Sequence, residues 1–255
     1  MSDKIDMKIS GSSTMPGGEY GKVSISGSGK IQGNLKCESL SCSGSGKVKG
    51  DVVAQNVSCS GSAKIEGSTD CREKLSTSGS FQCNGTVEAQ ELKCSGSFHA
   101  QGKVTGGEFR VSGVMQAEAG VHCREFRSSG STCIRGDLEA EYVRLRGVTE
   151  ISGLLNAETV EISAGASSKV GDIGGGTITV RREENTWRIF GFSTGRSSSL
   201  ETNSIEGDRV ELEYTTAKVV RGKQVIIGEG CKIDRVEYTE TFQAQPDTVG
   251  QAVQL

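Results

Sequence analysis

The sequence predicts an all-β protein whose chain winds into a single-stranded parallel β-helix. Three observations predict this fold class: a short motif recurs every 17 or 18 residues, apolar and polar residues alternate within each repeat, and the composition is unusual. Glycine accounts for 36 of the 255 residues, proline for 2, and aromatic residues for 5%. A motif repeated at a fixed period is typical of a solenoid, in which each repeat forms one turn.

The repeats are clearest in the N-terminal half, where each begins with a serine and a glycine. Alternation of apolar and polar residues over short stretches is the pattern of half-buried strands. The recurrent glycines suit corners that need a positive φ angle or a missing Cβ. The copies begin at Ser26 (SGSGKIQG), Ser43 (SGSGKVKG), Ser60 (SGSAKIEG), Ser78 (SGSFQCNG) and Ser95 (SGSFHAQG), and degenerate copies follow at Ser112, Ser129, Arg146 and Ala164.

Aligning the repeats places like side chains in files that run through the interior. Because one turn cannot bury its inner face alone, stacking the turns makes the core. We expect three short sides per turn and a narrow, triangular cross-section, which suits Val, Ile, Ala and Cys. The files begin Ile31, Val48, Ile65, Cys83; Leu40, Val57, Leu75, Leu92; and Cys37, Ala54, Cys71, Ala89.

The length of the turns divides the chain into regions. An extra residue in the third turn falls at 72–74, where we expect a corner. After Val170 the repeat shortens to an apparent step of 14, which puts Ile205, Val219 and Ile233 in one file. About 12 or 13 turns are expected in all, spaced by about 4.8 Å. We predict 17-residue turns over 1–172, a continued β-helix with shorter turns over 173–243, an inserted loop or hairpin at 181–199, and a flexible tail at 244–255.

No catalytic, cofactor-binding or metal site is predicted. The nine cysteines are odd in number and include no CxxC pair, so we interpret them as small core residues, with Cys133 facing outward. His99 and His122 fall at outward positions, where we expect surface residues and not the fixed geometry and cavity that a catalytic histidine needs. No phosphate-binding GxxxxGK[ST] motif occurs. An isoelectric point of 5.6 without interleaved aromatic residues argues against a nucleic-acid partner.

No apolar run reaches the about 18 residues of a membrane span, and the N-terminus lacks the apolar region of a signal peptide. A cytoplasmic location is expected.

Two surface features are candidate partner surfaces. Four cations occupy the same outward position on consecutive turns, but glutamates stand two residues earlier in three of those turns, so we favour a ladder of compensating ion pairs. A second basic stripe, Lys30, Lys47 and Lys64 with Lys49 nearby, has less compensation. The stretch WRIFGF either docks a partner or membrane surface or covers one flank. The candidate residues are Lys93, Arg110, Arg127, Arg144, Trp187, Phe190 and Phe192.

The SGSGKI-x-G repeats and the closing segment IEGDRVELEYTTAKVVRGKQVIIGEGCKIDRVEY resemble the bactofilins, in particular the longer form found in Firmicutes. The resemblance runs from about Lys8 to Tyr238. It implies a right-handed β-helix that polymerises end to end without nucleotide and serves as a scaffold in cell shape, cell-wall enzyme placement or motility. Some bactofilins bind the inner face of the membrane through an apolar N-terminal tail, which is absent here, so membrane attachment is left open.

The ends of an open β-helix suggest the same function from physics alone. Each end exposes unpaired backbone and a slice of core, and no segment shows the periodicity of a capping helix. We therefore expect the chain itself as the principal partner, with N-to-N and C-to-C contacts in a filament without polarity, because the two ends differ in turn length. The predicted interfaces are Ile5, Met7 and Ile9 at the N-terminal end and Val236, Tyr238 and Phe242 at the C-terminal end.

Two alternative functions stay open at this point. Hexapeptide-repeat acyltransferases are also β-helices, but the inward spacing of 6, 5 and 6 from Ile31 to Val48 departs from a strict hexapeptide. A rod that binds one partner without assembling is the other alternative.

Overall fold

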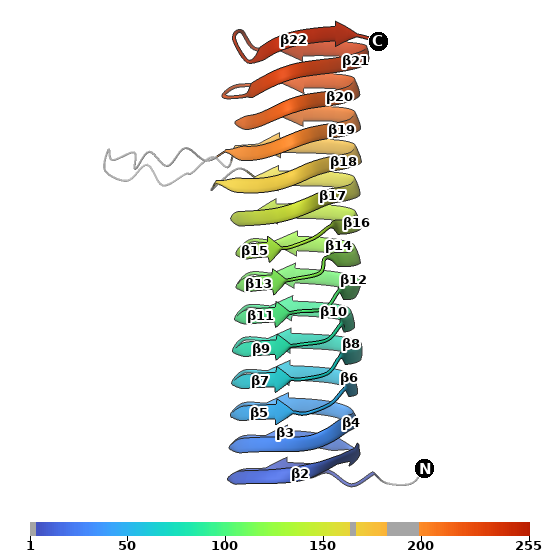
Figure 1. The fold of residues 1–255 in the computed structure, drawn as a ribbon, viewed down its shortest axis with the longest axis vertical. Helices are drawn as coiled ribbons and strands as arrows, with labels where there is room; N and C mark the ends of the chain where they lie inside the picture. The colour runs from blue at the N-terminus through green and yellow to red at the C-terminus, as the bar shows by residue number, and fades with distance from the viewer. Residues whose placement is uncertain (1–3, 164–166, 183–198) are drawn as a thin grey trace, which may run out of the picture. The chain divides into compact units, whose positions relative to one another are not determined.

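A computed structural model describes residues 4–163, 167–182 and 199–255, and these residues contain 22 β-strands and no helix. The strands pair in parallel and wind into a β-helix of about 13 turns, as the sequence predicts (Figure 1). The chain divides into two compact units, which are described separately. Unit 1 comprises 1–125 and 133–136, and unit 2 comprises 126–132 and 137–255.

Unit 1 alternates short and long strands, and equivalent strands of successive turns pair with one another. In Figure 1 the short strands β5, β7, β9 and β11 therefore form one column. The strands are β1 (Met7–Ile9), β2 (Ser12–Glu19), β3 (Lys22–Ile25), β4 (Ser28–Cys42), β5 (Ser45–Val48), β6 (Val52–Cys59), β7 (Ser62–Ile65), β8 (Thr69–Thr77), β9 (Ser80–Cys83), β10 (Val87–Cys94), β11 (Ser97–Ala100), β12 (Val104–Val111) and β13 (Val114–Ala117), while β14 (Val121–Ser128) and β15 (Ser131–Ile134) contribute to both units.

The predicted files of core side chains are confirmed by the register. Ile31 pairs with Val48 and Val48 with Ile65, and all three are at most 1% exposed. The extra residue at 72–74 produces a register shift at the expected corner. Aromatic residues also enter the interior. Phe81 and Phe98 stack with ring centroids 5.6 Å apart, and Phe109 and Phe126 are likewise fully buried.

At the serine–glycine corners from Gly27 to Gly113, glycine at the second position is required by the turn below. A Cβ on Gly79 would overlap the carbonyl oxygen of Gly61, and the same overlap recurs up the file. That carbonyl accepts the backbone N–H of Ser80 at 2.8 Å. The missing side chain therefore lets one corner rest directly on the next and close a hydrogen bond.

Unit 2 has longer strands because several corners are absorbed into continuous strands. Its turns are indeed shorter than 17 residues near the C-terminus, but the apparent step of 14 was wrong: Ile205 pairs with Val220, and Val220 pairs with Val236, which are steps of 15 and 16. The sequence alignment had put Val219 in the interior file, which Val220 occupies. The strands are β16 (Leu138–Arg146), β17 (Val148–Ser163), β18 (Ser168–Arg181), β19 (Leu200–Leu212), β20 (Thr215–Ile227), β21 (Lys232–Ala244) and β22 (Val249–Gln254).

The expectation of a flexible tail over 244–255 is also corrected. After a turn that includes Asp247 with a φ of 59°, the chain forms β22, which pairs with β21 from Ile233 to Tyr238. Thr248 is buried and donates its hydroxyl hydrogen to the Gln245 carbonyl oxygen at 2.6 Å. The sequence pattern missed this strand because most of its residues are polar, glycine or alanine.

The corner constraint predicts the effect of a single methyl group. Gly79→Ala should lower the free energy of unfolding by about 1–3 kcal/mol, the usual cost of overpacking a site that cannot relax. Gly11 is the matched control, because it occupies the first position of the same file and a Cβ there meets nothing within 4 Å. Urea denaturation of both variants measures the difference, and equal stability of the two would contradict the constraint.

Candidate assembly surfaces

The N-terminal end of unit 1 keeps open backbone edges. Strand β1 pairs with β3 and β2 pairs with β4 on one side, and no described strand pairs with their other side. An edge strand presents a row of N–H and C=O groups that readily pair with another chain. The end of unit 1 is therefore a surface suited to a further strand.

The side chains predicted for this end divide between surface and core. Ile5 is 77% exposed, as an interface residue must be in the free chain. Met7 and Ile9 are 4% and 2% exposed and pair in register with Val23 and Ile25. Their assignment to an interface is corrected, because they already belong to the core.

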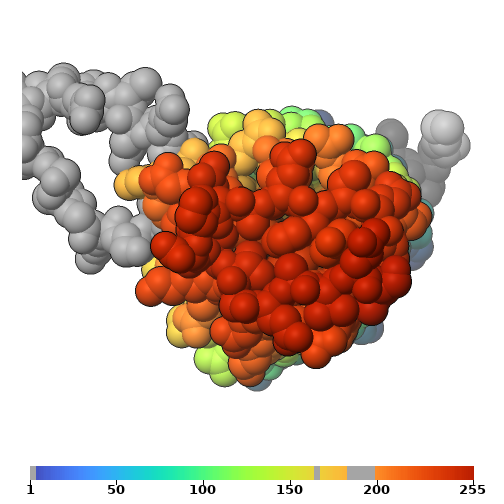
Figure 2. Space-filling view, turned by 90° about the horizontal axis from the view of Figure 1, so that it is seen from above, coloured from blue at the N-terminus to red at the C-terminus, as the bar shows by residue number. Residues whose placement is uncertain are grey.

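The C-terminal end of unit 2 is formed by β21 and β22. Figure 2 shows that residues of these strands fill this end without a central opening. Val236 lies beneath β22, opposite Ala252, and is fully buried. Its assignment to an interface is therefore wrong, and the reason is the strand that the sequence analysis did not predict.

Tyr238 and Phe242 remain at this end and are half-buried. Their rings stack with centroids 5.2 Å apart. Val249 and Ala252 continue the core files of Ile233 and Val236. Val249 is half-buried and Ala252 is exposed, so they form the outermost layer of these files. The C-terminal end thus offers a small apolar surface that the sequence analysis had placed one turn too early.

The backbone of this end is also only partly paired. The last cross-strand hydrogen bond runs from the Leu255 N–H to the Tyr238 carbonyl oxygen at 2.9 Å. Beyond it, residues 239–244 of β21 pair with β20 on one side and with no described strand on the other. The outer edge of β22 likewise has no partner among the described residues.

The basic file in unit 1 is neutralised by its own neighbours. Lys93 and Arg110 pair in register, as predicted. The Lys93 Nζ lies 2.7 Å from a Glu91 carboxylate oxygen, and Arg110 lies 3.3 Å from Glu108. The Lys93 ammonium holds the pKa of the Glu91 carboxyl below its usual value. These contacts favour the interpretation as an ion-pair ladder over a free anion-binding strip.

The two members of this file in unit 2 also have partners. The Arg144 guanidinium lies 3.3 Å from the Glu161 carboxylate, and that of Arg127 lies 5.0 Å from the ring centre of Tyr142. The remaining candidates on this surface, Trp187, Phe190 and Phe192, lie outside the described residues.

The cysteines occupy the positions expected of core residues. Eight are buried and Cys133 is half-exposed. Cys94 donates weak hydrogen bonds to the carbonyl oxygens of Gly96 and Val114, at 3.5 and 3.4 Å, so a corner thiol contacts the corner of the next turn. In the described part of the chain, no group of three His, Cys, Asp or Glu residues is arranged to hold a metal ion.

Both histidines lie at the surface of unit 1, as the sequence predicts. His99 Nε2 lies 3.4 Å from Glu118, which lies 3.3 Å from Arg135, on an open surface. His122 is exposed. The geometry of this part of unit 1 is that of a surface ion-pair network.

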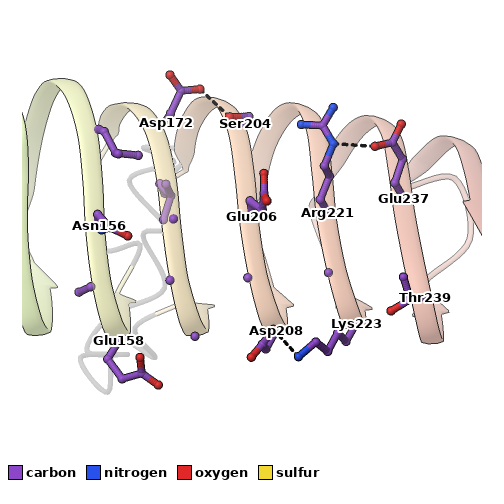
Figure 3. A pocket seen from close by; sticks show the side chains of 18 of the residues that line it. Asn156, Glu158, Asp172, Ser204, Glu206, Asp208, Arg221, Lys223, Glu237 and Thr239 are labelled. Atoms are coloured by element: carbon purple, nitrogen blue, oxygen red, sulfur yellow. Dashed lines mark hydrogen bonds and ion pairs between the residues drawn. The ribbon is translucent and has the colours of Figure 1, made fainter. Parts of the chain in front are cut away.

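A groove on unit 2 was missed altogether by the sequence analysis (Figure 3). It has a volume of about 840 Å³ and crosses the equivalent segments of β17 to β21. Glycines from β18, β19 and β20 line its floor, and polar side chains stand along it. A signal was present in the sequence: Gly174-Gly175-Gly176, Gly207 and Gly222 interrupt the strand pattern.

Comparison with known protein families finds a match for the N-terminal part of the chain. Residues 6–105, which lie in unit 1, match the family Bactofilin, described as polymer-forming cytoskeletal. These residues form a bactofilin domain. The resemblance seen in the serine–glycine repeats is therefore confirmed over this range.

The bactofilin domain also has relatives among curated proteins. The chain is 46% identical over 89 residues to the uncharacterized protein YhbF of Bacillus subtilis (strain 168), which covers 34% of this chain and 35% of YhbF. It is 49% identical over 47 residues to the uncharacterized protein YhbE of the same organism, which covers 18% of this chain and 20% of YhbE. The matches thus span well under half of either relative. No solved structure matches the chain.

No helix in the described residues is long and apolar enough to cross a bilayer.

The burial of the thiols predicts their reactivity. Burial raises the pKa of Cys37, Cys71 and Cys94 to about 11 and that of Cys123 to about 12, so these thiols stay protonated and unreactive at pH 8. The hydrogen bond with Cys59 lowers the pKa of Cys42 to about 7, but Cys42 is only 2% exposed and is shielded from reagents by its burial. A thiol reagent should therefore modify the half-exposed Cys133 well before the buried thiols in the folded protein.

Timed alkylation followed by mass spectrometry measures this order. Cys133→Ser should remove the fast phase, whereas the matched variant Cys94→Ser should keep it. A fast phase that persists in Cys133→Ser would contradict the burial of the other thiols.

Proposed function

We propose that this chain is a non-enzymatic cytoskeletal scaffold that assembles end to end into filaments without nucleotide. One observation carries the proposal: the strands at both ends of the β-helix keep a backbone edge with which no described strand pairs. The polymer-forming description of the matching family supports it.

Stacking is the only route by which a turn of this fold buries its inner side chains. Each interior turn has a neighbour above and below, while each end turn has one neighbour. A second copy placed on an end supplies the missing neighbour, together with a row of backbone hydrogen bonds. The same interactions that build the β-helix therefore extend it.

We further propose that like ends meet, which gives a filament without polarity. Turn length does not distinguish the two ends, contrary to the sequence-based expectation, because the first and last turns both advance by 16 residues. The edges do differ in strand content: the N-terminal end has a three-residue β1 and an eight-residue β2, whereas β22 covers part of a thirteen-residue β21. Because the two ends differ in outline, each end fits a second copy of itself better than it fits the other end. The N-to-N contact and the C-to-C contact would then each lie on a two-fold axis.

The cellular roles proposed for this scaffold follow from the resemblance to bactofilins. They are support of cell shape, placement of cell-wall enzymes, or motility, with client proteins bound along the filament. A non-enzymatic role agrees with the open surface around the histidines and with thiols that are buried.

Electron microscopy of the purified full chain, without nucleotide, tests the assembly. Val249→Asp should place a charge at the C-terminal end and leave N-to-N dimers as the largest species. Val148→Asp is the matched control, because Val148 is 48% exposed on the side of unit 2 and should assemble normally.

Three outcomes would overturn parts of the proposal. Monomers of the wild-type chain at high concentration would exclude end-to-end assembly. If Val249→Asp stays monomeric while the wild-type chain forms filaments, the contacts are head-to-tail and like ends do not meet, because every head-to-tail contact uses a C-terminal end. Unbroken filaments of that variant would exclude the C-terminal end as an interface.

A further inference from the structure

The groove on unit 2 is acidic over the part formed by β17, β18 and β19. Five side-chain carboxylates and two cations line it. Both cations stand on β20 and are already paired: Arg221 lies 2.6 Å from Glu237, and Lys223 lies 2.9 Å from Asp208. Figure 3 shows these pairs at one end of the groove. The two cations at that end are therefore already neutralised by carboxylates that line the groove.

Three carboxylates on successive turns are not compensated. Glu158 on β17 and Glu206 on β19 are exposed and make no ion pair with any described residue. Asp172 on β18 accepts a hydrogen bond from the Ser204 hydroxyl at 2.6 Å but has no cationic partner in the described chain. In Figure 3 the three are spread across the width of the groove. Cationic groups entering the groove would meet a carboxylate on each of three turns.

The groove is deep in part because Gly174 has no side chain, although the stacking of the turns does not require glycine at that position. A Cβ on Gly175 would overlap the Ala157 carbonyl oxygen, so that glycine is required by stacking. A Cβ on Gly174 would meet only the ends of two flexible side chains, 3.2 Å from Asn156 Oδ1 and 3.8 Å from Leu154 Cδ1. A larger residue at position 174 would fill the groove without straining the β-helix.

The complementary surface stands on unit 1. We name it the lysine facet: Lys30, Lys47 and Lys64, which are in register on three successive turns, with Lys49 beside them. Glu66 pairs with Lys47 at 2.7 Å, and nearby Lys49 and Lys64 help to lower the pKa of its carboxyl. Lys30 and Lys64 have no carboxylate partner among the described residues. Glu66 is therefore shared by three of the four lysines, Lys47, Lys49 and Lys64.

We propose that the lysine facet of one copy docks sideways into the groove of a second copy. Charge complementarity supports this occupant, and so does spacing, because successive turns of both units repeat at the strand separation of about 4.8 Å. The three lysines can therefore meet one carboxylate on each of three turns. The carboxylates do not stand in one file, because Glu206 is level with Gly174, two residues along β18 from Asp172. The long lysine side chains span the width of the groove and carry their charge past its rim.

The contact is independent of the end-to-end interface. It uses side chains on the sides of the units, whereas end-to-end stacking uses backbone edges and apolar residues. The ionic contact should weaken by about ten-fold or more between low and high salt, because exposed charges are screened beyond a Debye length of about 10 Å at 0.1 M. It would join filaments side by side, or single copies if the ends are blocked.

A charge-swap experiment tests the contact in the full chain. One variant carries Lys30→Glu, Lys47→Glu and Lys64→Glu, and the other carries Glu158→Lys, Asp172→Lys and Glu206→Lys. Each alone brings like charges together and should lose lateral association by at least ten-fold. An equimolar mixture restores opposite charges at both possible contacts and should recover it. Sedimentation at 50 mM salt, with Val249→Asp present in every chain to limit end-to-end growth, measures the association.

Gly174→Leu provides a test that changes no charge. It should abolish lateral association while leaving the thermal unfolding midpoint and the end-to-end filaments unchanged. The proposal is overturned if the wild-type chain shows no salt-sensitive lateral association, if the mixture does not recover it, or if Gly174→Leu associates normally. Binding of oligolysine by the groove without self-association would also overturn it, in favour of another cationic partner.

Discussion

The structure depends on the contact between one corner and the corner below it. At the serine–glycine corners a side chain is excluded because the carbonyl oxygen of the preceding turn occupies its place, and that oxygen accepts the hydrogen bond that joins the turns. The corner sets how closely turns approach, and that approach lets each core residue cover the one beneath it. The glycine content of the chain is thus a requirement of stacking and not a sign of disorder.

The same contact explains how much of the fold is readable from the sequence. A constraint repeated in every turn leaves a periodic trace, and the files through Ile31, Leu40 and Cys37 follow from aligning the corners. The prediction weakens in unit 2, where corners vanish into continuous strands. There Val219 and Val220 are both apolar, and without a fixed corner the alignment chose the wrong one.

The ends and the groove were the least predictable parts, for two different physical reasons. End strands bury little, so β22 carries almost no apolar pattern, and the interface was assigned to Val236 one turn below the true end. The groove is made by residues such as Gly174 and Glu206, which come together only through the register of separate turns. Ion pairs such as Glu91–Lys93 were predictable, because both partners lie on one strand.

Hydrogen exchange of the assembled and dispersed chain tests most directly whether stacking continues across molecules. If it does, backbone amides of β1, β2, β22 and residues 239–244 become protected as the chain assembles, while amides within the interior turns keep the protection they already have. Assembly that leaves these end amides exchanging as fast as in the dispersed chain would contradict the account.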